Sequence, residues 1–177
     1  MKQGYVQVYT GNGKGKTTAA LGLCMRALGA GLSVYIGQFI KGMRYSEIIT
    51  LEKLSSIFGS EKLKVEQYGR GCFIWRTPEP ADIAAAQEGL KKATQAMLSG
   101  NYDLVIVDEI NIALYYNLIS EKDLNQFLDS RPLEVELVLT GRYAPASLIA
   151  RADLVTEMCE IHHYYTKGVE AREGIER

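Results

Sequence analysis

The sequence predicts an α/β fold, in which helices cover a doubly wound, mainly parallel sheet within a single domain. Strand-like and helix-like segments alternate along the chain, a pattern typical of parallel sheets. Several strand candidates are apolar almost throughout, as strands buried on both faces are. The chain has 177 residues, enough for one core that needs no disulfide or structural metal. No linker-like stretch and no internal repeat divides residues 1–177 into smaller units.

The first elements are a strand, a helix and a second strand. Residues 5–9 (Tyr-Val-Gln-Val-Tyr) form a strand candidate that leads directly into a glycine-rich turn. Residues 16–28 are rich in Ala and Leu and predict a helix, which Gly29 and Gly31 end in the usual C-terminal role. Residues 32–39 are apolar almost throughout and predict a buried strand.

A helix, a short strand and a long helix follow. Residues 47–58 predict a helix and residues 63–67 a short strand. The prolines of residues 77–80 (Thr-Pro-Glu-Pro) are suited to the first turn of a helix. This long helix has an apolar face at helical spacing, formed by Ile83, Ala86, Leu90, Ala93 and Met97.

The last part of the chain adds three more strand candidates. Residues 104–107 are a short apolar strand, and residues 120–128 predict a helix. Residues 135–139 predict the next strand, Pro145 begins a short helix, and residues 153–161 alternate as a late strand does. The total is five to seven strands. Residues 165–177 have too few apolar side chains for a core element and are expected to form a surface tail.

Composition excludes several classes of protein. The chain has 20 Lys+Arg and 21 Asp+Glu, a formal net charge of −1, which argues against a dedicated nucleic-acid binder. No apolar run approaches the 18 or so residues that a membrane span needs. The N-terminus lacks an apolar signal segment. Cys24, Cys72 and Cys159 are far apart and lack metal-type spacing, so we expect reduced thiols and a cytoplasmic protein.

The most informative segment lies between the first strand and the first helix. It reads Thr10-Gly11-Asn12-Gly13-Lys14-Gly15-Lys16-Thr17-Thr18. Glycines let backbone N–H groups turn toward a polyphosphate, and the helix that begins here adds its positive dipole end. The spacing matches the phosphate-loop pattern G-x-x-x-x-G-K-[ST], except that Thr10 replaces the first Gly and Gly11 takes over its turn. Nucleotide binding by this loop, and therefore a P-loop NTPase-type (RecA-like) fold, is the prediction.

Two side chains of the loop have expected roles, and a third is left open. Lys16 is expected to reach the terminal phosphates, and the Thr17 hydroxyl to ligate Mg²⁺. Lys14 is a second cation, which either contacts a phosphate or is simply solvated.

An acidic pair, Asp108-Glu109, follows the apolar strand 104–107. A carboxylate at this end of a strand faces the crevice where open α/β sheets bind ligands. With the phosphate loop present, the pair predicts coordination of Mg²⁺ or its water, although an acid pair that caps a helix has the same sequence. Both acids are therefore candidate metal ligands, and the sequence does not distinguish the direct one.

A phosphate loop alone is compatible with ATPases, kinases, GTPases and transferases. The Asn/Thr-Lys-x-Asp motif with which GTPases read guanine is absent, and the arginines are scattered rather than grouped in a kinase-type lid. The balanced charge also argues against a motor that tracks along nucleic acid.

Further motifs resemble the ATP:corrinoid adenosyltransferases of the CobA/BtuR type, in the family's order and over nearly the whole chain. Beyond the loop segment 9–20, whose Thr10 is the family's own form, these blocks are residues 38–42 (QFIKG), 71–75 (GCFIW), 107–109 (VDE), 139–142 (LTGR), 152–158 (ADLVTEM) and 174–176 (GIE).

The resemblance implies a transfer reaction in which the Co(I) of a reduced corrinoid, cob(I)alamin or cobinamide, attacks C5′ of ATP and triphosphate leaves. Lys16 and Glu109 are then the catalytic candidates, with Mg²⁺ stabilising the departing triphosphate. Cobalt is the nucleophile, so no Ser, Cys or His nucleophile is needed. The alternatives are a P-loop ATPase or small-molecule kinase, in which Glu109 orients the acceptor, and a carrier without catalytic activity.

The resemblance also implies roles for side chains outside the loop. Phe73 and Trp75 match family aromatics on the lower face of the corrin, although two core aromatics would have the same spacing. Arg26 matches an arginine near the nucleotide. Lys41 is expected to face ribose or corrin, and Arg142 to approach either the triphosphate or an ion-pair partner.

The resemblance also implies partner proteins and a segment that covers the active site. The family suggests a homodimer and an electron-donating flavoprotein or reductase. Many relatives carry an N-terminal extension that covers the site, whereas here the first strand begins almost at once. We therefore expect a lid from elsewhere or a more open site. His162 and His163 are expected to be a surface pair, because neighbours on a strand point to opposite faces.

Overall fold

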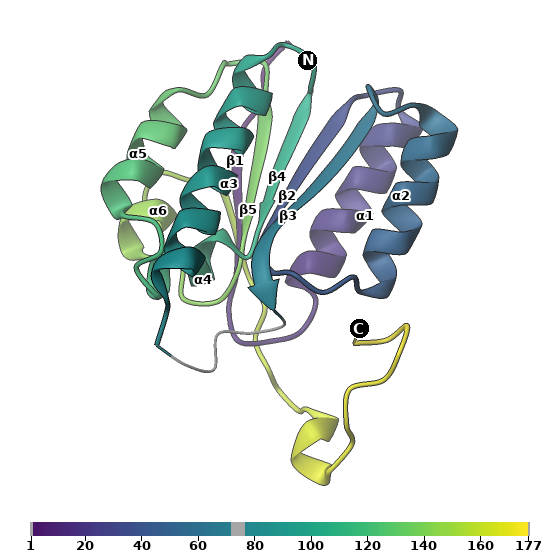
Figure 1. Ribbon diagram of the computed structural model, residues 1–177, viewed down its shortest axis with the longest axis vertical. Helices are drawn as coiled ribbons and strands as arrows, with labels where there is room; N and C mark the ends of the chain where they lie inside the picture. Colours follow the sequence, from purple (N-terminus) through teal and green to yellow (C-terminus); the bar gives the residue numbers. More distant parts are fainter. Residues whose placement is uncertain (1, 72–76, 177) are drawn as a thin grey trace.

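A six-stranded parallel sheet forms the centre of the molecule (Figure 1). The computed structural model describes residues 2–71 and 77–176. The strand order is β3-β2-β4-β5-β1-β6, and every neighbouring pair is parallel. The strands are β1 (Val6–Thr10), β2 (Val34–Lys41), β3 (Leu63–Gly71), β4 (Leu104–Asp108), β5 (Glu136–Thr140) and β6 (Leu154–Glu157).

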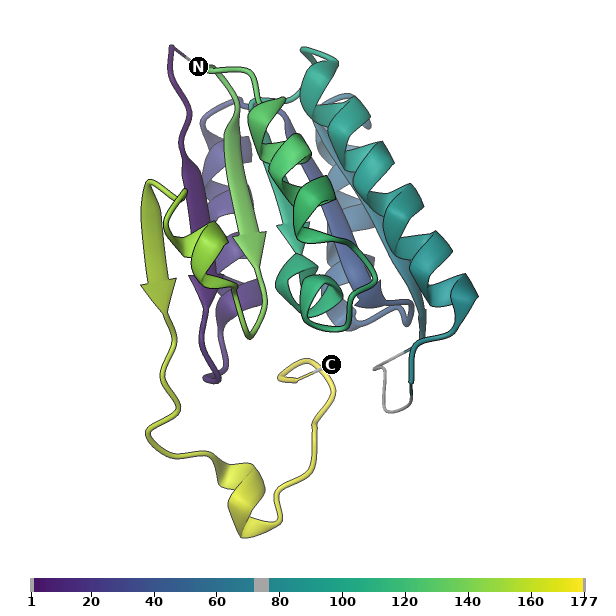
Figure 2. The same cartoon turned by 90° about the vertical axis from the view of Figure 1, so that its left-hand side faces the viewer.

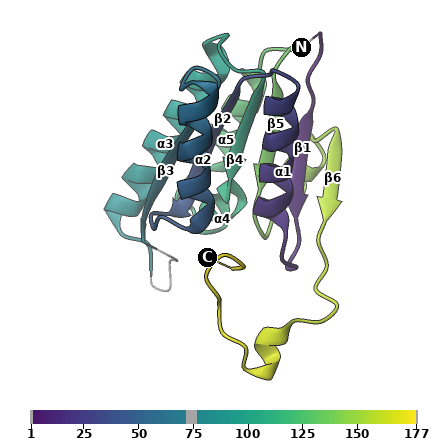
Figure 3. The same cartoon turned by 90° about the vertical axis from the view of Figure 1, so that its right-hand side faces the viewer.

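Helices cover both faces of this sheet, so the predicted doubly wound α/β fold is confirmed. Helices α1 and α2 lie on one face, and α3, α4, α5 and α6 on the other (Figures 1, 2 and 3). The helices are α1 (Lys16–Gly29), α2 (Ser46–Phe58), α3 (Pro80–Leu98), α4 (Ile110–Tyr115), α5 (Glu121–Asp129) and α6 (Ala146–Ile149), with a 3₁₀ turn η1 (Tyr164–Lys167). None of the helices in the described part of the chain is long and apolar enough to cross a bilayer.

The core has one layer on each side of the sheet. All five residues of β4 are buried, because alternate side chains enter opposite layers. Val105 and Val107 pack in the layer under α3, α4 and α5, whereas Leu104 and Ile106 pack in the layer under α1 and α2. The apolar face predicted for the long helix after residues 77–80 is the face that α3 turns to the sheet, with Ala93 and Met97 fully buried.

The start of α3 shows how the sequence sets an element boundary. Pro80 occupies the first turn, where a missing N–H costs no helical hydrogen bond. The backbone N–H of Glu79 donates to Asp82 Oδ2 over 2.9 Å. A side-chain acceptor thus satisfies a donor that the helix itself leaves free.

Four elements differ from the prediction. Helix α4 was not expected, because its six residues are too few to show a helical period. Strand β6 ends at Glu157 instead of residue 161, and all four of its residues are exposed at the sheet edge. Strands β2 and β3 run further than expected, to Lys41 and Gly71.

Beyond β6 the chain leaves the sheet and turns back below the carboxyl ends of the strands (Figures 2 and 3). Residues 158–176 are called the return segment below. Most of its side chains are exposed. It nevertheless contacts the phosphate loop, and this places residues 165–176 beside the most informative motif of the sequence.

Candidate functional site

The phosphate loop connects β1 to α1 at the carboxyl edge of the sheet. Gly11 and Gly15 have φ angles of +93° and +122°, which favour glycine. A Cβ on Gly11 or Gly13 would lie 2.4 or 2.7 Å from the carbonyl oxygen of Met158. The N–H of Gly13 donates to that same carbonyl over 2.7 Å. The glycines are therefore required both by the turn and by the close approach of the return segment.

Lys16 lies inside the loop, as the sequence predicted. Its ammonium donates to the carbonyl oxygens of Gly11 and Gly13 over 2.7 and 2.6 Å. Burial lowers the pKa of Lys16, and the nearby Glu109 carboxylate opposes this shift. The ammonium is thus held by neutral acceptors at the centre of the loop, where an anionic group would be a stronger partner.

Lys14, in contrast, points to the return segment. Its ammonium donates to Glu176 Oε1 and the Ile175 carbonyl, each over 2.9 Å, and contacts the Tyr164 hydroxyl at 3.3 Å. The Glu176 carboxylate also accepts from Tyr164 and Arg172. The sequence predicted that Lys14 either contacts a phosphate or is solvated. In the structure it is paired with a protein carboxylate, Glu176, which neither alternative included.

Asp108 lies at the end of β4 and accepts hydrogen bonds from several elements. Oδ1 accepts from the hydroxyls of Thr17 over 2.9 Å and Thr140 over 2.6 Å. Oδ2 accepts from Gln38 over 3.3 Å and from the Lys41 ammonium over 3.1 Å. The residue is 1% exposed. The structure thus brings together Thr17 and Asp108, two of the three predicted metal ligands.

Glu109 follows in a left-handed conformation, with φ 60°. This conformation is uncommon for residues other than Gly, Asn and Asp. Its N–H donates to Thr140 Oγ1 over 3.0 Å. Burial, with the adjacent Asp108 charge, raises the pKa of Glu109, although Lys41, Lys16 and Arg142 act in the opposite direction. The ionised form of Glu109 is therefore poorly stabilised, and a bound cation would stabilise it.

Lys41 contacts Thr17 and Asp108, a contact that the sequence did not predict. Its ammonium lies 3.1 Å from both Thr17 Oγ1 and Asp108 Oδ2. The prediction placed Lys41 at this edge but left it facing ribose or corrin. A register shift of β2 against β3, between Phe39 and Lys41, redirects the side chain. Such an irregularity has no signal in the sequence of an apolar strand.

The residues present fit a magnesium ion. The Thr17 hydroxyl and the carboxylates of Asp108 and Glu109 are oxygen donors, which Mg²⁺ prefers. Thr17 and Asp108 already accept one cation together, the Lys41 ammonium. The donor set is thus of the right chemistry, and two of its three members are arranged around a positive charge.

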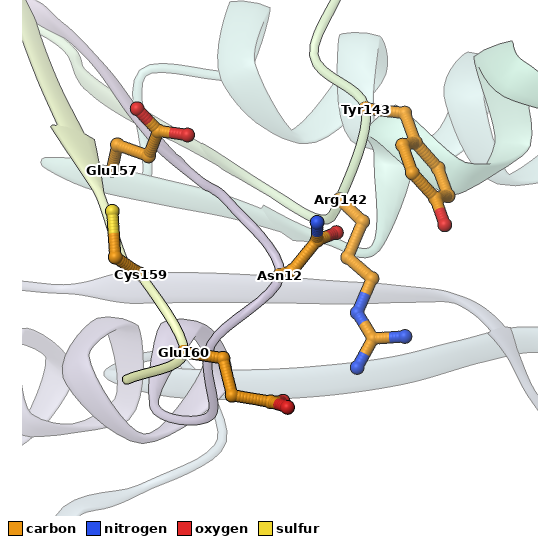
Figure 4. Close-up of a pocket in the computed structure, with 6 residues that line it drawn as sticks. All are labelled: Asn12, Arg142, Tyr143, Glu157, Cys159 and Glu160. Carbon is orange, nitrogen blue, oxygen red and sulfur yellow. The ribbon is translucent and has the colours of Figure 1, made fainter. Parts of the chain in front are cut away.

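A pocket adjoins the loop on the β6 side (Figure 4). This pocket, of about 510 Å³, is lined by Asn12, Arg142, Tyr143, Glu157, Cys159 and Glu160. Arg142 and Tyr143 come from the turn after β5, and the two glutamates from β6 and the return segment (Figure 4). Arg142 is exposed beside the loop, which is compatible with the approach to a triphosphate expected of it.

Other predicted residues lie elsewhere. Arg26 is in the last turn of α1, ten residues and about 15 Å of helix from Lys16, so the chain does not bring it to the loop. Phe73 and Trp75 lie outside the described residues. His163 follows the end of β6, and its Nδ1 accepts from the Tyr165 N–H over 3.0 Å. The two histidines are therefore not on a strand, because β6 ends before them.

A phosphate loop after the first strand, facing an acid at the end of β4, a parallel strand separated from β1 by β5 alone, defines a protein of the P-loop class. A family model described as ATP:corrinoid adenosyltransferase BtuR/CobO/CobP matches residues 2–177. The chain belongs to this family, which confirms the resemblance seen in the sequence.

Relatives named corrinoid adenosyltransferase match over nearly the full chain. One from Sinorhizobium sp. is 39% identical over 99% of this chain and 81% of its own length. One from Pseudomonas aeruginosa is 36% identical over 99% and 84%. A third, from Escherichia coli K12, is 32% identical over 99% and 86%.

Proposed function

We propose that this protein transfers the 5′-deoxyadenosyl group of ATP to the Co(I) of a reduced corrinoid and releases triphosphate. Membership of the ATP:corrinoid adenosyltransferase family supports the reaction. The observation that carries the site is the hydrogen bond between Thr17 and Asp108, because it joins the phosphate loop to the acidic strand end.

The protein's part in this reaction is electrostatic. The cobalt forms the new bond to C5′, the C5′–O bond breaks, and its electron pair leaves on the triphosphate. Lys16 and the N–H groups of Gly15 and neighbouring loop residues bind that triphosphate and stabilise the charge that it gains. Asn12, Lys14 and Thr18 belong to the same loop and complete the proposed nucleotide contacts. The loop therefore holds a leaving group and transfers no phosphoryl group.

Mg²⁺ would be held by Thr17 together with Asp108 and Glu109. When bound, it supplies positive charge to the triphosphate oxygens. The raised pKa of Glu109 supports this role, since a cation would relieve the repulsion between the two acids.

Phe73 and Trp75 are proposed to contact the corrin. Gly71, the last described residue before them, ends β3 at the carboxyl edge of the sheet, the same edge as the phosphate loop. Flat aromatic side chains suit the apolar face of a corrin ring. Arg26 is proposed as a nucleotide contact on the resemblance alone.

The family also suggests the cellular setting. We propose a cytoplasmic homodimer that receives its electron from a flavoprotein or another reductase. Cobalamin and incomplete corrinoids such as cobinamide are both candidate acceptors.

The decisive experiment is anaerobic. The protein is mixed with MgATP and chemically reduced cobalamin, the visible spectrum is followed, and the phosphate product is identified. Adenosylcobalamin with inorganic triphosphate supports the proposal. ADP with an unchanged corrinoid would instead indicate an ATPase or kinase, and tight binding of both substrates without any product would indicate a carrier.

The controls separate the loop from the corrin contacts. Lys16→Met should lose nucleotide binding. Trp75→Ala should keep nucleotide binding and lose turnover with the corrinoid. Lys91→Met, a change on the exposed face of α3, should behave as the wild type.

A further inference from the structure

The chain bends sharply just before Lys41. Ile40 has a φ of +67°, a region that β-branched residues normally avoid, because their Cβ substituents clash with the backbone. The register between β2 and β3 shifts at the same point, from Phe39 opposite Tyr68 to Lys41 opposite Gly71. Local strain of this kind persists only where the surrounding structure imposes it, and it is concentrated at functional sites.

This irregularity directs Lys41 into the acidic site. The Lys41 side chain is 14% exposed and the Asp108 side chain 2% exposed. The ammonium is 3.1 Å from Asp108 Oδ2 and 3.1 Å from Thr17 Oγ1. A largely buried ion pair of this type is expensive to form, because both charges leave water, and so it seldom persists for stability alone.

The two partners of Lys41 are also two of the three oxygen donors that fit Mg²⁺. The ammonium therefore provides one positive charge at the place where those donors would hold two. It balances the negative charge of Asp108, which lies next to Glu109. It also keeps the Thr17 hydroxyl directed at Asp108, at the end of β4.

We propose that Lys41 is the built-in counter-ion of the magnesium site. In the nucleotide-free protein it holds Asp108 and Thr17 in place, and it gives up this position when Mg²⁺ arrives with the triphosphate. Lys41 is thus a positioning residue for the metal ligands, and the strained bend at Ile40 is what aims it. The inference rests on the proposed use of Thr17 and Asp108 as metal ligands.

The test measures Mg²⁺ binding without nucleotide. Wild type, Lys41→Met and Lys41→Gln are titrated with MgCl₂ by calorimetry at constant ionic strength. Gln can still donate a hydrogen bond to Asp108, so the Lys41→Gln variant allows Mg²⁺ affinity to be measured if Lys41→Met does not fold. The matched control is Lys64→Met, which removes a lysine that pairs with Glu66 at 3.2 Å on β3, away from the site.

Removing the competing charge should tighten Mg²⁺ binding by about tenfold or more, because a like charge within a few ångströms strongly opposes a divalent cation. Lys64→Met should bind Mg²⁺ as the wild type does. An affinity that is unchanged, weaker or too low to detect in both Lys41 variants would overturn the proposal, since Lys41 would then not occupy the metal position.

Failure of this inference is distinguishable from failure of the proposed function. Adenosylcobalamin formation by the wild type, with unaltered Mg²⁺ affinity in the Lys41 variants, removes only the counter-ion role. Tighter Mg²⁺ binding in those variants, with no adenosyl transfer by the wild type, retains that role and removes the transferase.

Discussion

The hydroxyl of Thr17 donates a hydrogen bond to Asp108 Oδ1 over 2.9 Å, between residues 91 positions apart in the sequence. Thr17 is in the first turn of α1, and Asp108 ends β4. The loop and the acid are thus already joined in the protein without nucleotide. A site aligned in advance loses less conformational freedom when its ligand binds.

Asp108→Asn should destabilise the protein. The change leaves the largely buried Lys41 ammonium without its carboxylate and turns an amide group toward hydroxyl and amide donors. We expect a loss of about 3 kcal/mol in the free energy of unfolding, measured by urea denaturation. Asp129→Asn, in an exposed ion pair with Arg151, should cost under about 1 kcal/mol. Equal losses in the two variants would contradict this account.

Lys16→Met should reduce kcat/KM for adenosyl transfer by about a hundredfold or more, the scale for losing one preorganised electrostatic contact. The variant should still fold, although the carbonyl oxygens of Gly11 and Gly13 lose their shared donor. Circular dichroism checks the fold, and the rate of Co–C bond formation checks the activity. A variant that is folded and fully active would exclude Lys16 from the reaction.

Glu109→Gln should make the protein more stable at pH 8. The pKa of Glu109 is raised above its usual 4.5, chiefly by burial, so ionisation costs the folded state more than the unfolded chain. This cost is absent below about pH 4.5, grows as the pH rises and is complete above the folded-state pKa. The gain from Gln should therefore shrink toward acid pH in urea titrations at several pH values. Glu134→Gln, at an exposed position, is the control, and a wild type more stable than Glu109→Gln at pH 8 would refute the argument.

Gly13→Ala and Gly22→Ala should have opposite effects. A Cβ at Gly13 would meet the backbone of Met158 and Cys159 at 2.7–2.9 Å, so the return segment must move. We expect a loss of about 2 kcal/mol. Gly22 is an exposed residue in α1 with nothing within 4 Å of an added Cβ, and Ala should there stabilise by about 0.5–1 kcal/mol. Urea denaturation of both variants tests the pair, and a stabilised Gly13→Ala would show that the close contact is absent.

Glu176→Gln should loosen the return segment. Its carboxylate is the shared acceptor of Lys14, Arg172 and Tyr164, and Gln lacks the charge that holds the two cations. Trypsin should then cut faster after Lys167 and Arg172. MgATP should have the same effect on the wild type, because a triphosphate would compete with Glu176 for Lys14. Glu173→Gln, without an ion pair among the described residues, should leave the cleavage rate unchanged, and equal rates in both variants would count against the carboxylate as the anchor.

The sequence was sufficient for the parts of the molecule that depend on local pattern. The strand, glycine loop and helix of residues 5–28 are contiguous, and each step has its own signal. Asp108 could be placed opposite the loop because parallel strands carry their ligand-binding ends on one edge. The contact between Thr17 and Asp108 follows from these two local patterns and one rule of topology.

The features that were missed depend on contacts between distant segments. The direction of Lys41 arises from a register shift against β3, and an apolar strand gives no sign of one. Lys14 and Glu176 are 162 positions apart, so composition indicated only a polar tail. Helix α4 is held by the burial of Ile110, Ala113 and Leu114, which only the assembled core explains.

The position of β1 in the sheet also has a consequence for synthesis of the protein. Strand β1 is made before the other five strands of the sheet, yet its two neighbours, β5 and β6, are the last two of the six to be made. Until they emerge, β1 has two bare edges, which can pair with other chains. We therefore expect the phosphate loop at its end to bind nucleotide only after β5 and β6 have been made, and a chain truncated before β5 should neither bind ATP nor remain free of aggregation.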